Sequence, residues 1–122
     1  MTRFLPQVLL VAALVLNATA NILVKYSATR IVPAPPGSPP AARLLAVLHP
    51  AFVAGLILFG LNVFAYQGAL RTLKLSVAYP IMVSGGYLLI LLASVFLFQE
   101  RLAAPQYAGI ILILAGIWLV VR

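Results

Sequence analysis

The sequence predicts an all-α membrane protein in which four transmembrane helices form a bundle, and three observations support this fold class. First, 65% of the 122 residues are hydrophobic and 7% are charged, whereas a soluble domain carries about 25% charged residues. Second, the hydrophobic residues gather in four long runs that Lys and Arg residues bound. Third, a strand would leave unpaired backbone groups in hydrocarbon, so each run is expected to be helical.

The four runs are long enough to cross a bilayer, which requires about 20 mostly apolar residues. They lie at about 4–26, 44–70, 76–98 and 105–121. The basic residues at their ends are placed where membrane proteins meet lipid headgroups. We therefore expect a single transmembrane domain that comprises residues 1–122.

The first connection differs in composition from the others. Residues 29–42 contain five prolines, and such a segment is extended or irregular and acts as a semi-rigid spacer. We interpret it as a connector. The later connections are short, so the second, third and fourth helices are expected to form successive hairpins.

The charge balance indicates contact with lipid and leaves the orientation open. The chain carries eight Lys and Arg residues against one acid, Glu100. The basic residues stand singly at helix ends, so anionic lipid is the expected partner and nucleic acid is not. Four basic residues fall at each membrane face. Either one orientation dominates, or the chain inserts both ways and pairs as an antiparallel dimer, an inverted repeat made of two subunits.

No enzyme, cofactor or metal site is expected. The sequence has no cysteine and a single histidine, His49, so it lacks the ligand clusters that hold metals. Glu100 has no second carboxylate for general acid–base chemistry.

Polar residues recur along one face of the first span. Asn17, Asn21 and Lys25 are four residues apart and therefore share a helix face. Burying amides in hydrocarbon is costly without partners, so this stripe should face the interior of the assembly. The two asparagines either line a substrate cavity or join helices by hydrogen bonds. Lys25 either binds substrate or extends to the membrane interface.

The second and third spans contain further candidates for substrate binding and for bending. Asn62 and Tyr66 are again four residues apart, and Tyr79 opens the third span. The third span also contains Pro80 and the pair Gly85 and Gly86. Proline and glycine pairs weaken or kink helices, so these three residues are predicted hinge positions.

The fourth span has two glycines on one face. Gly109 and Gly116 are seven residues apart, and small residues on one face allow helices to approach closely. This face is either a dimer interface or an internal packing surface.

Several segments resemble the small multidrug resistance branch of the drug/metabolite (EamA-like) transporter superfamily. Residues 69–80 resemble the junction of its second and third helices, and residues 98–102 resemble the turn before its fourth helix. Residues 23–27 resemble the end of its first helix, and residues 109–116 match the glycine spacing of its dimer-forming helix. The resemblance implies a dimer of four-helix subunits that transports small molecules across a membrane.

Two positions depart from the drug and guanidinium exporters of that branch. Asn17 falls where they place an essential membrane carboxylate, and Met82 falls where they place a tryptophan against aromatic cations. Without a titratable group at position 17, proton-coupled cation export lacks its chemistry. The chain is more similar to the flippase subunits that move aminoarabinose-phosphoundecaprenol, which lack that carboxylate and share the Ala78-Tyr79-Pro80 run.

From this resemblance we expect a small transporter, in a bacterial inner membrane, of a polyprenyl-phosphate sugar or a similar amphiphilic lipid. It would act as a homodimer or as a heterodimer with a paralogous subunit. The alternatives are a drug or small-cation exporter and a non-transporting subunit of a membrane complex. The expected substrate-binding residues are Asn17, Asn21, Lys25, Asn62, Tyr66, Tyr79 and Met82.

Overall fold

The computed structural model describes residues 2–122, and within this range its regular structure is helical. Four helices are long and apolar enough to cross a membrane, which confirms the predicted fold class. A short fifth helix, α2, was not predicted. The elements are a 3-10 turn at Thr2–Phe4, α1 (Leu5–Arg30), α2 (Pro40–Val47), α3 (Pro50–Leu70), α4 (Leu75–Phe96) and α5 (Ala104–Val121).

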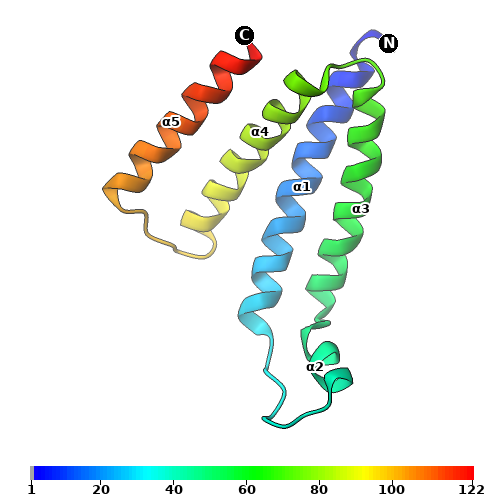
Figure 1. Cartoon of the computed structure of the whole chain (residues 1–122), viewed down its shortest axis with the longest axis vertical. Helices are drawn as coiled ribbons and strands as arrows, with labels where there is room; N and C mark the ends of the chain where they lie inside the picture. Colours follow the sequence, from blue (N-terminus) through cyan, green and yellow to red (C-terminus); the bar gives the residue numbers. More distant parts are fainter. Residues whose placement is uncertain (1) are drawn as a thin grey trace.

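The four long helices form an open layer in which α1 is central. It packs against α3 on one side and α4 on the other, and α5 packs against α4 (Figure 1). Successive long helices run in opposite directions, so both termini lie at one end of the layer (Figure 1). The proline-rich connection and the α4–α5 turn lie at the other end. The two groups of basic residues therefore lie at opposite ends of the bundle.

Prolines mark the start of several helices. Pro40 and Pro50 are the first residues of α2 and α3, and Pro105 lies in the first turn of α5. A proline is tolerated there because the first-turn N–H groups have no intrahelical acceptor. His49 completes the start of α3, since its Nδ1 accepts a hydrogen bond of 3.1 Å from the backbone N–H of Ala51.

The structure differs from the predicted helix boundaries around the first connection. The run expected as one span at 44–70 is divided, because residues 44–47 belong to α2 and α3 begins only at Pro50. The reason is local: the residue before a proline is driven toward extended backbone, and His49 has φ −72° and ψ 146°. The irregular segment is also shorter than the expected 29–42, since α1 continues to Arg30 and α2 begins at Pro40.

Small side chains allow α1 to lie close to both neighbours. Ala13, Ala69 and Ala78 are completely buried and form the core cluster together with Leu10 and Met82. Close packing of small residues is the usual way in which membrane helices associate, because lipid tails are as apolar as the side chains themselves. Most large apolar side chains instead point outward, which is consistent with a surface that faces acyl chains.

Helix α5 is the least buried of the long helices. No residue of α5 is buried, and a methyl group added at Gly109 or Gly116 would meet nothing within 4 Å. These two glycines therefore do not pack against the helices of their own chain. Their assignment to a dimer interface remains a prediction.

The buried glycine of α3 offers a test of this packing. A Cβ at Gly55 would lie 3.1 Å from Val24 Cγ2 and 3.2 Å from the carbonyl oxygen of Ala20. Overpacking costs about 1–3 kcal/mol and replacing a helical glycine gains about 1 kcal/mol, so Gly55→Ala should lower the free energy of unfolding by about 1 kcal/mol. Gly60→Ala, in open space, should raise it. Titrating the purified variants with sodium dodecyl sulfate measures the free energy of unfolding of each. If the two substitutions changed it equally and in the same direction, the result would contradict the packing at Gly55.

Candidate functional site

The polar stripe of α1 lies along the groove between α1 and α4. The side-chain amide of Asn21 donates to both the backbone oxygen of Asn17, at 2.9 Å, and its Oδ1, at 3.1 Å. Both asparagines are half-buried. Across the groove, a Cβ at Gly86 would stand 3.5 Å from Asn17 Nδ2. The absence of a side chain at position 86 therefore leaves the amide of Asn17 open toward α4.

The stripe continues into a cavity at the end of the groove. This cavity has a volume of about 210 Å³, and its polar lining comes from Asn21, Lys25, Ser94 and Glu100. Its remaining walls are apolar side chains from α1, α4 and the α4–α5 turn. Amide, ammonium, hydroxyl and carboxylate groups thus converge on one small volume near the membrane face, a combination that can hydrogen-bond a polar headgroup.

Two of the residues that line this cavity form an ion pair. Lys25 Nζ lies 3.3 Å from Glu100 Oε1, and the two side chains are 49% and 42% exposed. The turn after α4 brings the carboxylate into place: Gln99 adopts a left-handed φ of 52°, and the Glu100 backbone N–H donates to the Ser94 oxygen at 2.9 Å. With this exposure the pair contributes at most about 1 kcal/mol to stability.

A second polar cluster lies between α3 and the start of α4, near the α3–α4 turn. Asn62, Tyr66, Gln67 and Tyr79 line a cavity of about 410 Å³. The rings of Tyr66 and Tyr79 are stacked, with centroids 6.3 Å apart and planes at 27°. Two polar atoms here, Asn62 Oδ1 and Tyr66 OH, are buried without a hydrogen-bond partner among the described residues. Buried groups of this kind are costly to leave unpaired and are suited to a ligand.

The two clusters enter the bilayer from opposite faces and reach the same depth. A Cβ at Gly55 would contact Ala20 and Val24, and one at Gly68 would contact Leu9. These two contacts align α3 with α1 along the axis of the bundle. At a rise of about 1.5 Å per residue, Asn62 then lies within about one helical turn of the depth of Asn17. One cluster thus begins at the Lys25 end of the bundle, the other begins near the α3–α4 turn, and both end near the middle.

The structure therefore separates the residues that the sequence grouped as one site. Asn17, Asn21 and Lys25 lie together on α1, whereas the residues from α3 and the start of α4 form a different cavity. Met82 lines neither cavity and is buried in the apolar core.

The proposed hinge residues lie within an unbroken helix. α4 continues through Pro80, Gly85 and Gly86. Both glycines face α1, and a Cβ at Gly85 would stand 2.9 Å from Leu14 Cδ2. They therefore allow close approach of α4 to α1 in this conformation, and their role in bending remains a prediction.

Sequence reasoning missed Ser94 and the pairing of Glu100 with Lys25. Glu100 lies in the predicted turn between the third and fourth spans, and Ser94 sits in an apolar run without polar neighbours at helical spacing. The signal that was present is topological: the end of the first span and the turn after the third lie at the same membrane face in an up-and-down bundle.

Comparison with known proteins shows the family to which the sequence is related. The family model described as "Small Multidrug Resistance protein" matches residues 47–113. An uncharacterized protein of Sinorhizobium fredii, y4nH, is 34% identical over 118 residues, which cover 96% of this chain and 95% of the relative.

A shorter match links the chain to a protein with a stated activity. The probable 4-amino-4-deoxy-L-arabinose-phosphoundecaprenol flippase subunit ArnF of Proteus mirabilis is 38% identical over 68 residues. This match covers 54% of the chain and 50% of the flippase subunit. No solved structure shows a significant match.

Proposed function

The chain belongs to the small multidrug resistance family of membrane transporters, and we propose that it moves a polyprenyl-phosphate sugar or a similar amphiphilic lipid across the bilayer. The observation that carries this proposal is the pair of polar clusters that extend from opposite faces to mid-depth, where their polar groups are uncharged amides and a phenol. Amides and phenols can exchange hydrogen bonds with sugar hydroxyls. The partial similarity to a flippase subunit supports the same substrate class.

The chemistry of such a lipid fits the distribution of charge. Its tail stays in hydrocarbon, so only the headgroup needs a polar path. Its phosphate carries negative charge, and cations stand at both ends of that path: Lys25 at one end, and Arg71 and Lys74 at the α3–α4 turn. Lys25 is paired with Glu100, so a phosphate there would compete with the carboxylate for the ammonium group.

A proton-coupled cation exporter fits these residues less well. Such a mechanism needs an acid within the membrane that binds a proton and a cation in turn. Glu100 is the only acid of the chain, and it lies in the α4–α5 turn with 42% of its side chain exposed and a lysine beside it.

We further propose that the transporter is a dimer in a bacterial inner membrane, either of two copies or of this chain and a paralogue. The exposed α5 face around Gly109 and Gly116 is the candidate contact, since small residues there permit close approach of a second helix. The equal division of basic residues between the two faces supports an antiparallel pair.

Mass spectrometry of the lipids that co-purify with the protein in mild detergent tests the substrate class. We expect enrichment of a polyprenyl-phosphate sugar over the membrane extract, with less of it bound to Asn17→Ala or Lys25→Gln. Thr19→Ala is a matched control, because Thr19 is exposed and its hydroxyl donates only to the Val15 oxygen of its own helix. Bulk phospholipid alone on all four proteins would contradict the proposal.

A further inference from the structure

The short helix α2 and the residue that follows it carry an apolar stripe that no other part of residues 2–122 covers. Ala41, Leu44, Leu45 and Leu48 follow the spacing i, i+3, i+4 and i+7, so they form one face. All four are exposed, and the leucine side chains are exposed by 62%, 68% and 43% in chain order. Three exposed leucines on so short an element would be unfavourable in water.

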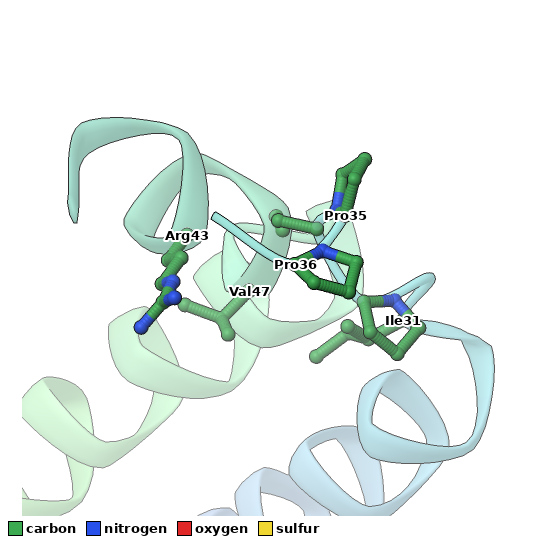
Figure 2. Close-up of a pocket in the computed structure, with 8 residues that line it drawn as sticks. Ile31, Pro35, Pro36, Arg43 and Val47 are labelled. Atoms are coloured by element: carbon green, nitrogen blue, oxygen red, sulfur yellow. The ribbon is translucent and has the colours of Figure 1, made fainter. Parts of the chain in front are cut away.

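The opposite face of α2 is already occupied by the proline-rich segment. Arg43, Ala46 and Val47 line a cavity of about 360 Å³ together with residues 31 and 33–36. Figure 2 shows Arg43 and Val47 of α2 on one side of this cavity and Ile31 and Pro36 on the other. The leucine stripe therefore points away from the segment to which α2 is attached, and Arg43 lies on the face opposite the leucines.

The position of α2 along the chain determines what lies beside the stripe. Only Leu48, the last residue of the stripe, and His49 separate α2 from α3, which is a membrane-spanning helix, and α1 ends at Arg30 on the same side of the bilayer. Figure 1 shows α2 beyond the end of α3 at the extremity of the α1–α3 hairpin. The end of α2 is therefore close to the membrane face at which α3 begins.

We propose that α2 is an interfacial helix whose leucine stripe inserts between the headgroups and the acyl chains of the leaflet at the α1–α3 hairpin. Arg43, on the opposite face, then lies among lipid phosphates. Apolar residues on one face and a cation on the other are typical of helices that lie in the membrane plane, and an anionic surface attracts such a cation.

Site-directed spin labelling tests this placement directly, because the chain has no cysteine and single-cysteine variants can be labelled without further changes. Leu45→Cys and Arg43→Cys report the two faces of α2, and Phe64→Cys, 73% exposed on the membrane-spanning helix α3, provides the lipid reference. Each labelled full-length protein is reconstituted in vesicles of phosphatidylcholine and phosphatidylglycerol. Collision rates with oxygen and with a water-soluble nickel complex are then measured.

We expect the ratio of oxygen to nickel collisions at position 45 to approach that at position 64 and to exceed that at position 43 several-fold. Removing phosphatidylglycerol should lower the ratio at position 45 in the wild-type background more than in an Arg43→Gln background. Equal, high nickel accessibility at positions 43 and 45 would overturn the proposal in favour of a solvated helix. Protection of position 45 from both reagents would overturn it in favour of a protein partner, including a second copy of the chain.

Discussion

Replacing Asn17 with alanine is expected to slow transport of a lipid-linked sugar by about tenfold while the bundle stays folded. A hydrogen bond contributes about 0.5–1.5 kcal/mol, and the upper part of this range corresponds to a tenfold change. Asn17→Ala removes the amide that faces Gly86 and also the Oδ1 that accepts from Asn21. The rate is measured in vesicles with the purified variant, and circular dichroism in detergent checks that helix content is unchanged.

Thr19→Ala is the control for this variant. It removes a polar group from the same helix two residues away, but from an exposed position whose hydroxyl bonds only within the helix. Its transport rate should match that of the unmodified protein. If Asn17→Ala and Thr19→Ala transport equally fast, Asn17 has no part in the substrate path.

Filling the groove at Gly86 should have a larger effect. In Gly86→Leu the added side chain extends from a Cβ that stands 3.5 Å from Asn17 Nδ2 and 3.7 Å from the Leu14 carbonyl oxygen. It would therefore occupy the space in front of the Asn17 amide and move α4 away from α1. We expect transport to fall to the level of protein-free vesicles, with a loss of about 1–3 kcal/mol in the free energy of unfolding from overpacking.

Two substitutions separate blockage from misfolding. Gly86→Ala places only a methyl group at ordinary contact distance, so it should preserve stability and most of the transport rate. Gly60→Leu introduces the same bulk on α3 where nothing lies within 4 Å of the added Cβ, and it should leave transport unchanged. Normal transport by a stable Gly86→Leu protein would show that the headgroup does not use the α1–α4 groove.

The fold class could be predicted because the bilayer imposes helices on long apolar runs. The division of the predicted second span could not be predicted from hydropathy, since Leu44 and Leu45 are as apolar as a span requires. The local signal was the His49-Pro50 pair, where the residue before proline favours extended backbone. A short apolar helix outside a span and the first turns of a span can have the same apolar composition. Only the path of the backbone distinguishes them.

The candidate site could be predicted only within single helices. The four-residue spacing of Asn17 and Asn21 indicated a shared face, and the structure joins these residues by a hydrogen bond. Contacts between helices, such as the stacking of Tyr66 on Tyr79, depend on how the bundle packs and leave no periodic signal. The expectation for Met82 came from the family resemblance, and a matching position in a family does not distinguish a cavity wall from the core.

The most direct test of the proposed transport is a flipping measurement in vesicles that contain only the purified protein. A short-chain polyprenyl phosphate that carries an amino sugar is placed in the outer leaflet, and an impermeant amine reagent reports how much remains there over time. We predict that the protein accelerates its movement to the inner leaflet, saturably and without any requirement for a pH gradient. No acceleration over protein-free vesicles, together with gradient-driven uptake of a quaternary ammonium cation, would contradict the proposal and identify a cation exporter.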